Sequence, residues 1–306
     1  MNQDNKGILV SISCITYNHA PYIRECLDGF MMQQTNFPFE VLIHDDASTD
    51  GTTEIIQEYA EKYPDIIKPL YEEENQWVKG RRGSAVFNFP RAQGKYIALC
   101  EGDDYWTDPL KLQKQVDFLE SHPDYVMCTH RFKQYLQEEK LLKEDWYGQI
   151  DSNIHYTHTS YIEFREWYTQ PLTVMFRLNA IDLSLYCKYT NSRDLTLFYV
   201  LLKKGKGVML NESMAVYRIH NNGIWSGNSF EAQRTSDIKA CIGIYEAERT
   251  KESSVMLYNR ISQCRKISLK YLLKNRILLY TAFTIIHKYY GFRRAMNIFL
   301  RSFISF

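Results

Sequence analysis

Apolar runs of strand length alternate with segments of helical apolar spacing throughout the first 125 residues. The runs predict strands at residues 8–18, 39–48, 66–73 and 95–101, and the spacing predicts helices at residues 21–34, 51–64 and 108–123. Strands that alternate with helices of about 10 to 15 residues indicate βαβ units and a mainly parallel sheet. The strands are almost continuously apolar, as expected when helices cover both faces of the sheet. We therefore expect an α/β fold in this part of the chain.

Polar side chains gather where three of the predicted strands end. In sheets of this kind, ligands bind at the carboxyl ends of the strands. The polar clusters at those ends are Thr16, Tyr17 and Asn18, then Asp45 and Asp46, then Asp103 and Asp104. Their convergence predicts one binding site at this edge of the sheet.

Two adjacent carboxylates, Asp103 and Asp104, follow the strand predicted at residues 95–101 and lie close to Glu101. A buried unpaired carboxylate is strongly disfavoured, and neighbouring carboxylates repel each other unless a cation neutralises them. Oxygen ligands select Mg²⁺ or Mn²⁺, and such an ion also bridges phosphate oxygens. The pair therefore predicts a divalent metal that binds together with a nucleotide diphosphate. The alternative is a solvated acidic turn without a ligand.

The end of the strand predicted at residues 39–48 carries a second acid, Asp46. A carboxylate placed there accepts a hydrogen bond from N3–H of uracil. The alternative is a turn followed by a helix cap, since Asp, Ser and Thr accept hydrogen bonds from free helix N–H groups. We favour the capping role for Ser48, Thr49 and Asp50, and the nucleobase contact for Asp46.

Other phosphate-binding devices are absent from the sequence. There is no GxxxxGK[ST] segment, which excludes a P-loop protein, and no GxGxxG follows the first strand. The glycine-rich start of sugar nucleotidylyltransferases is also missing. The first predicted strand runs instead into the sequence TYNHAPYI.

Three segments resemble the family 2 glycosyltransferases of bacterial surface-polysaccharide type. They are SISCITYNHAPYIRECLDGF, EVLIHDDASTDGTTEII and GKYIALCEGDDYWTDPLKLQKQVDFL. The resemblance in order and spacing covers residues 8–130 and continues more weakly to about residue 228. It implies a GT-A fold, in which a mainly parallel sheet has flanking helices. It also implies inverting transfer of a sugar from a nucleotide-sugar, usually UDP-linked, with Mn²⁺ or Mg²⁺ at a DxD-like motif.

The resemblance assigns nucleotide-binding residues by position. Thr16, Tyr17 and Asn18 close the first strand beside the nucleotide, and Asp46 contacts the base. Arg218 lies in a later segment, VYRIHNNGIWSG, which resembles a loop that closes over the pyrophosphate. We therefore expect these five residues to bind the nucleotide, together with Asp103.

The same resemblance assigns the metal site and part of the acceptor site. Asp103 and Asp104 occupy the DxD-like position, with Asp104 the direct metal ligand, although GDD replaces a literal D-x-D. The resemblance places His220 near the metal, whereas an ordinary surface or packed histidine is the alternative. Trp225 stacks on the acceptor sugar or, alternatively, packs the loop.

Inverting transfer needs a general base that deprotonates the acceptor hydroxyl. The family places this acid at the start of a helix, where many relatives have a Glu-Asp pair. Here Arg193 precedes Asp194, so Asp194 is the candidate base, and a helix cap is the alternative. Glu101 and Glu212 are next in line. The donor phosphates and the metal stabilise the leaving group, so the reaction requires no protein acid there.

The tail of the chain is basic. Of the 37 Lys and Arg residues, ten lie in residues 253–306, where no Asp or Glu occurs, which leaves 27 against all 36 acidic residues in the rest. Basic residues among apolar residues of helical periodicity indicate binding to an anionic membrane surface. The alternative is a helical subdomain that packs on the catalytic part. The acidic remainder disfavours nucleic acid as the partner.

The start of the chain and its cysteines favour a cytoplasmic protein at the inner face of the membrane. We find no signal peptide, and the longest apolar run, residues 277–286, is about half of what a spanning helix needs. The seven cysteines are scattered and never spaced as CxxC, which fits a reducing compartment.

The expected organisation is a catalytic domain at residues 1–228 and a helical basic region at residues 229–306. The expected function is hexosyl or N-acetylhexosaminyl transfer to a saccharide or lipid-linked saccharide. A non-catalytic protein that binds nucleotide-sugars or acts as a scaffold in glycan assembly is the alternative.

Overall fold

A computed structural model describes residues 7–80, 83–163, 169–223, 225, 227–263 and 274–303. The described residues form two compact units. Residues 7–156, 169–181 and 204–219 make up the first unit, and residues 157–163, 182–203 and 220–303 make up the second. The second unit therefore combines the tail with residues 157–163, 182–203 and 220–228, which precede the predicted boundary. The boundary predicted between residues 228 and 229 separates catalytic from non-catalytic parts, and it stays a prediction.

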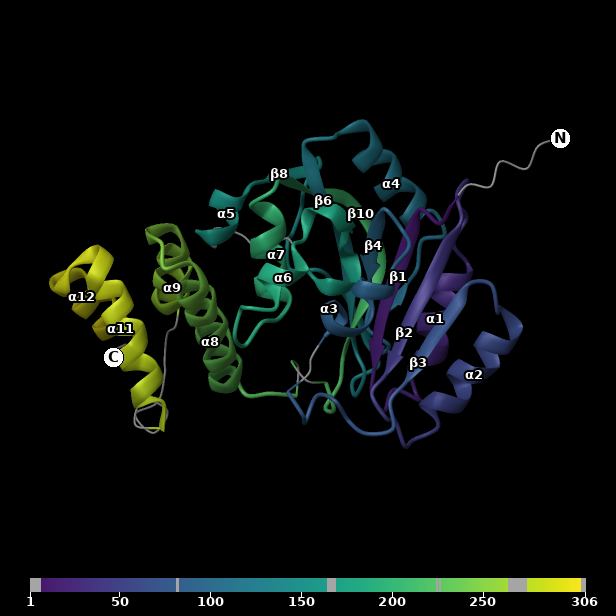
Figure 1. Cartoon of the computed structure of the whole chain (residues 1–306), viewed down its shortest axis with the longest axis horizontal. Helices are drawn as coiled ribbons and strands as arrows, with labels where there is room; N and C mark the ends of the chain where they lie inside the picture. Colours follow the sequence, from purple (N-terminus) through teal and green to yellow (C-terminus); the bar gives the residue numbers. More distant parts are fainter. Residues whose placement is uncertain are drawn as a thin grey trace. The chain divides into compact units, whose positions relative to one another are not determined.

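The first unit is built on one mixed sheet, which contains ten strands among the described residues. Its main path runs in the order β3-β2-β1-β4-β9-β6-β10-β5, while β7 pairs with β6 and β8 pairs with β10. Figure 1 labels β1 to β4, β6, β8 and β10 of this sheet. The strands are β1 Val10–Thr16, β2 Phe39–Asp45, β3 Ile67–Tyr71, β4 Tyr96–Leu99, β5 Tyr105–Trp106, β6 Tyr125–Leu136, β7 Leu141–Glu144, β8 Ile154–Tyr156, β9 Met175–Arg177 and β10 Lys206–Ile219.

The four strands expected from the sequence, β1 to β4, pair in parallel. The α/β prediction is thereby confirmed. β9 then inserts antiparallel between β4 and β6, and β10 pairs in parallel with β6. The register places the last residue of β1, Thr16, beside the last residue of β2, Asp45. The carboxyl ends of neighbouring strands thus lie together, as the predicted site requires.

Four helices accompany the sheet in the first unit: α1 Ile23–Met31, α2 Thr52–Lys62, α3 Ser84–Phe87 and α4 Lys111–Ser121. α1 buries Ile23, Cys26, Leu27 and Phe30 on one face, which matches its helical apolar spacing. Its Gly29 lies against β5, because a Cβ there would come within 3.0 Å of the backbone of Trp106.

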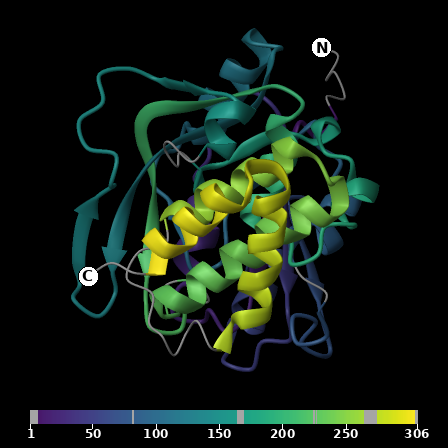
Figure 2. The same cartoon turned by 90° about the vertical axis from the view of Figure 1, so that its left-hand side faces the viewer.

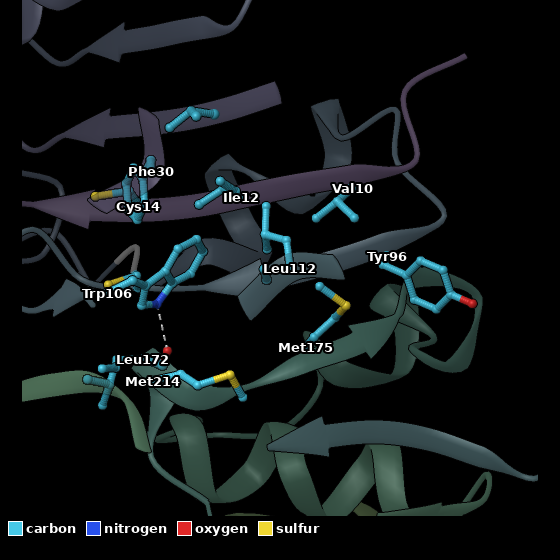
Figure 3. Packing of buried hydrophobic residues seen from close by; sticks show 14 of the residues in the cluster. Val10, Ile12, Cys14, Phe30, Tyr96, Trp106, Leu112, Leu172, Met175 and Met214 are labelled. Carbon is cyan, nitrogen blue, oxygen red and sulfur yellow. Dashed lines mark hydrogen bonds between the residues drawn. The ribbon is translucent and has the colours of Figure 1, made fainter. Parts of the chain in front are cut away.

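Trp106 is a buried member of the hydrophobic core of the first unit (Figure 3). Its indole Nε1–H donates to the carbonyl of Leu172 at 2.9 Å, so burial leaves no unsatisfied polar group on the ring. The ring also contacts Phe30 edge-on at 4.8 Å between centroids. On another side, the fully buried Lys111 places Nζ 3.6 Å from the ring centroid. Burial lowers the pKa of Lys111 to about 7.

Replacing Lys111 with methionine is expected to stabilise the protein, most strongly below pH 7. The folded protein binds the Lys111 proton weakly, whereas the unfolded chain holds it up to about pH 10.4. The stability of the wild type therefore rises with pH between these values. The gain from Lys111→Met, on the order of a few kcal/mol near pH 6, should shrink toward pH 10. Urea unfolding across this pH range measures the difference, with the exposed Lys62→Met as the control. A pH-independent difference would contradict the burial of a titrating amine.

The second unit is helical. Its described helices are α5 His158–Ile162, α6 Leu183–Tyr186, α7 Asp194–Leu202, α8 Phe230–Glu248, α9 Lys251–Gln263, α11 Arg276–Tyr290 and α12 Phe292–Phe303. α7 is buried from Leu195 to Leu202, as expected for a helix that is apolar on all sides. α11 and α12, the yellow helices of Figure 2, contact each other. Gly291, which lies between them in the sequence, has a positive φ. Within the described residues, every helix is too short or too polar to cross a membrane.

Candidate active site

The ends of β1 and β2 are tied together by Asn18. This residue adopts a positive φ of 55°, which asparagine tolerates better than most residues. Its backbone N–H donates to Oγ of Ser48 at 2.9 Å, and its Oδ1 accepts from the N–H of Thr49 at 2.8 Å. Tyr17, beside it, is exposed. Asn18 therefore shapes the floor of the predicted nucleotide site, while the Tyr17 ring remains accessible to a ligand.

Asp46 connects the end of β2 to the segment after β3. Its Oδ1 accepts from the N–H of Gln76 at 2.6 Å, and its Oδ2 accepts from the N–H of Trp77 at 3.1 Å. Its own N–H donates to the carbonyl of Thr16 at 3.0 Å. A carboxylate offers about four lone-pair sites, so these contacts leave capacity for one more donor such as a base N–H. The structure thus adds a loop-anchoring contact to the predicted nucleobase role.

Asp50 accepts from a helix N–H as expected, whereas Ser48 contacts Asn18 and Asp45. The N-cap residue of α2, Gly51, has no side-chain cap. The Ser48 hydroxyl donates to Oδ1 of Asp45 at 2.5 Å. The Asp50 carboxylate accepts from the N–H groups of Ala20 and Thr52 at the start of α2. These contacts join the two loops that flank the site.

The Asp103 and Asp104 turn packs on the end of β1. The N–H of Gly102 donates to the carbonyl of Ile15 at 3.0 Å, and a Cβ on Gly102 would lie 2.7 Å from Oγ1 of Thr16. Only glycine allows this close approach. The Oγ1 atom of Thr16 is buried and has no hydrogen-bond partner among the described residues. Thr16 therefore contacts Asp46, through its carbonyl, and Gly102, the residue before the Asp103–Asp104 pair.

Asp104 is the more buried acid, with 3% of its surface exposed. Its Oδ1 accepts from the backbone N–H of Arg218 at 2.8 Å, and its Oδ2 has no hydrogen-bond partner among the described residues. Burial, and then the charge of the adjacent Asp103, raises the pKa of Asp104 well above its usual range. Asp103 lies 3.7 Å from Nε2 of His19, measured from Oδ2. A cation at this point would relieve the repulsion between the two carboxylates.

The residues present fit a divalent metal that is shared with substrate phosphates. Within the described ranges, no group of three or more His, Cys, Asp and Glu side chains could hold an ion by itself. Mg²⁺ commonly binds through one or two carboxylates and completes its shell with water and phosphate oxygens. The partnerless Oδ2 of Asp104 and the neighbouring Asp103 supply such a donor set.

Arg218, predicted to bind the nucleotide, is 5% exposed. Its guanidinium donates to the carbonyl of Asp103 at 2.9 Å, to Oε1 of Gln137 at 2.6 Å and to Glu25. The nucleotide contact stays a prediction, while the observed partners are all protein groups. The sequence did not predict that Glu25 and Gln137 contact Arg218, because no sequence pattern links residues so far apart in the chain.

In the second unit, Asp194 is the first residue of α7. Its Oδ1 accepts from Nε of Arg193 at 3.0 Å and from the N–H of Leu195 at 2.8 Å. Its Oδ2 has no hydrogen-bond partner among the described residues, and 27% of the side chain is exposed. One oxygen is thus fixed and the other remains able to accept a proton, as a general base requires.

Arg193 links Asp194 to the segment that carries Trp225. The guanidinium lies 4.2 Å from the centroid of the Trp225 ring, and it also donates to Ser236 and Asp237. His220, predicted to lie near the metal, is buried at the start of the same segment. In this unit, Asp194 and Trp225 both contact Arg193. The acceptor role of Trp225 and the metal role of His220 stay predictions.

Comparison with known sequences identifies relatives of the chain. The sequence profile of glycosyl transferase family 2 matches residues 11–181. An uncharacterized protein of Mycobacterium tuberculosis is 38% identical over 224 residues, which cover 71% of this chain and 60% of the relative. This chain therefore matches less than two thirds of that relative's length. The putative teichuronic acid biosynthesis glycosyltransferase TuaG of Bacillus subtilis is 32% identical over 230 residues, or 74% of this chain and 85% of the relative.

A further relative has a stated activity, and two solved structures share the fold. The Escherichia coli protein WfaP, named UDP-Glc:alpha-D-GlcNAc-diphosphoundecaprenol beta-1,3-glucosyltransferase, is 25% identical over 77% of this chain and 87% of its own length. Staphylococcus aureus TarS 1–349 with UDP-GlcNAc superposes with a TM-score of 0.65 at 18% identity, over 96% of this chain and 85% of TarS. The mannosyltransferase PcManGT of Pyrobaculum calidifontis, with GDP-Man and Mn²⁺, gives a TM-score of 0.52 at 17% identity, over 98% and 88%. Both structures have the GT-A fold expected from the sequence.

Proposed function

This chain belongs to glycosyl transferase family 2, and we propose that it transfers a sugar from a UDP-linked donor to a saccharide acceptor with inversion. The observation that carries the proposal is the convergence at Thr16. After β2, Asp46 donates its N–H to the carbonyl of Thr16, and after β4, Gly102, next to Asp103, packs closely against the Thr16 side chain. A nucleobase acceptor and a pair of metal-binding acids at that edge are what a nucleotide-sugar needs.

Each predicted site residue has a proposed role in this reaction. Asp46 binds the base, and Asp103 with Asp104 hold Mn²⁺ or Mg²⁺ at the diphosphate. When bound, the ion stabilises negative charge on the departing diphosphate. Asp194 accepts the proton of the acceptor hydroxyl on Oδ2 while the acceptor oxygen bonds to the anomeric carbon and the bond from that carbon to the phosphate oxygen breaks. Trp225 and His220 belong to the acceptor side and the metal side, respectively.

Turnover of the purified full chain tests the proposal. UDP-glucose, UDP-N-acetylglucosamine and GDP-mannose are offered with Mn²⁺, and release of the nucleotide diphosphate is measured with saccharide and diphospholipid-linked saccharide acceptors. We expect release from a UDP-sugar that depends on the metal and on an acceptor. Binding of UDP-sugars without release under any of these conditions would favour the non-catalytic scaffold instead.

Discrimination between UDP and CDP tests the role of Asp46. A carboxylate accepts from N3–H of uracil, whereas cytosine has no proton at N3. CDP should therefore bind about ten- to a hundredfold more weakly, since an unmatched buried acceptor costs about 1–3 kcal/mol. Calorimetry with both nucleotides measures the difference. Equal affinities would mean that Asp46 serves only to anchor the Gln76–Trp77 segment.

We further propose that the acceptor is lipid-linked and that α11 and α12 place the enzyme at the inner face of the cytoplasmic membrane. WfaP, by its name, acts on a diphosphoundecaprenol-linked sugar. Large apolar side chains are exposed on both helices, at Ile277, Tyr280, Phe292 and Leu300. Exposed arginines accompany them, and residues 253–306 contain no acid. An apolar surface with a purely basic charge fits an anionic lipid surface.

Reversing two charges of α12 is expected to weaken binding to anionic vesicles. Each arginine near such a surface contributes about 1 kcal/mol, so Arg293→Glu with Arg294→Glu should lower the partition coefficient at least about tenfold. Co-sedimentation with vesicles of phosphatidylglycerol and phosphatidylcholine measures it. Lys140→Glu with Lys143→Glu, exposed on the β6–β7 hairpin, is the matched control. If both pairs of substitutions lowered the partition coefficient equally, the effect would come from the net charge of the protein. A packing role for the tail would then be favoured.

A further inference from the structure

Arg218 connects three parts of the first unit that are distant in the sequence. It lies next to the last residue of β10, and its backbone N–H donates to Oδ1 of Asp104 at 2.8 Å. Its Nε donates to the carbonyl of Asp103 at 2.9 Å, so the arginine holds both residues of the acidic turn. Its Nη1 donates to Gln137, after β6, at 2.6 Å, and its Nη2 donates to Glu25 on α1.

Three tyrosine rings enclose the same guanidinium. The Arg218 Cζ atom lies 4.8 Å from the ring centroid of Tyr22, 5.2 Å from that of Tyr105 and 5.5 Å from that of Tyr135. Cation–π contacts strengthen when water is excluded, and the residue is 5% exposed. The guanidinium is thus held in one orientation from several sides.

This arrangement differs from that of a phosphate-binding arginine, which keeps its fork accessible to the ligand. Each guanidinium nitrogen of Arg218 already donates to a protein oxygen. The carbonyl of Asp103 and Oδ1 of Asp104 are both fixed, while Oδ2 of Asp104 keeps no hydrogen-bond partner among the described residues. That oxygen is the one that a metal would use.

We propose that Arg218 is a positioning residue for the metal site, which fixes the Asp103–Asp104 turn and does not contact the nucleotide. The proposal rests on the glycosyltransferase function proposed above. It predicts that Arg218 controls the affinity for the metal and leaves metal-free nucleotide binding unchanged. A direct phosphate contact predicts the reverse.

The experiment compares wild type, Arg218→Lys and Arg218→Met. Electron paramagnetic resonance measures Mn²⁺ affinity in the presence of UDP, and calorimetry in EDTA measures the affinities for uridine, UMP and UDP. Lysine keeps the charge but lacks the planar fork, so both variants should lose about tenfold or more in Mn²⁺ affinity, as expected when charge-assisted hydrogen bonds are lost. The affinities for the three metal-free ligands should match those of the wild type.

Two further variants guard against simple unfolding. Glu25→Gln removes the charge of one partner at its exposed end, and we expect a smaller loss of Mn²⁺ affinity, about threefold, with an unchanged circular dichroism spectrum. Arg24→Met removes an exposed arginine from the same helix and should change nothing. Wild-type Mn²⁺ affinity in Arg218→Lys would overturn the proposal, and so would a loss of metal-free affinity that grows from uridine to UDP. A wild-type protein that binds neither UDP nor Mn²⁺ would instead overturn the proposed function.

Discussion

Replacing Asp104 with asparagine is expected to abolish the metal-dependent part of UDP binding. Asparagine keeps the shape of the side chain and can still accept the N–H of Arg218, but it removes the anionic oxygen available to the ion. Because changes in the groups that merely support a metal ligand cost about 10- to 100-fold in metal affinity, loss of the ligand itself should cost at least about 100-fold. Calorimetric titration of UDP with and without Mn²⁺ measures the effect.

The fold should survive this change, which makes the result interpretable. Burial and the neighbouring Asp103 raise the pKa of Asp104, so its ionised form destabilises the metal-free protein at neutral pH. Asp104→Asn should therefore melt at the same temperature as the wild type or higher. Asp108→Asn, in the same segment but bonded to Lys114, is the matched control and should bind UDP and Mn²⁺ normally. Unchanged Mn²⁺-dependent affinity in Asp104→Asn would remove the metal assignment.

Strong periodicity explains why β1 to β4 and their helices could be predicted from the sequence. β1, β2 and β4 are buried along almost their whole length, so their largely apolar runs stop abruptly where the site begins, whereas β3 is only partly buried. The acids at those ends are visible because nothing in packing favours them there. β9 could not be predicted in the same way. It has three residues, Met175–Arg177, and it inserts antiparallel between strands that precede it in the sequence.

The partners of the site residues could not be predicted from the sequence, because they depend on how distant segments of the chain approach one another in the fold. Asp46 accepts hydrogen bonds from two backbone N–H groups. Such donors cannot be recognised in a sequence, because every residue except proline has a backbone N–H. The predicted nucleotide-binding residue Arg218 shows only a charge and a nearby loop in the sequence, whereas the fold surrounds it with Glu25, Gln137 and three rings. The grouping of α7 with the C-terminal helices in one compact unit is of the same kind, since α7 is buried from Leu195 to Leu202 and the sequence does not show which segments cover it.

Replacing Asp194 with asparagine is expected to lower turnover by about 10² to 10⁴ while donor binding stays unchanged. Asparagine can keep Oδ1 in place, accepting from Arg193 and Leu195, and it puts an amide nitrogen where Oδ2 stood. That nitrogen cannot accept a proton at neutral pH. The variant therefore changes the chemistry at one atom and preserves the position of the helix. Turnover is measured as UDP release in the presence of acceptor, and donor affinity is measured by calorimetry.

The competing role for Asp194 is an acid in the first turn of α7, which stabilises the helix through its dipole. That role predicts only a loss of about 0.3–1 kcal/mol in stability and normal turnover. Asp182→Asn is the matched control, because Asp182 caps the short helix α6 by accepting from the N–H of Leu185. Near-normal turnover in Asp194→Asn would move the base to Glu101 or Glu212. Of these, Glu212 is paired with Lys114 through one oxygen at 2.5 Å, much as Asp194 is paired with Arg193 at 3.0 Å. Asp194 stays the proposed base because it is the first residue of α7, the position that the family resemblance gives to this acid.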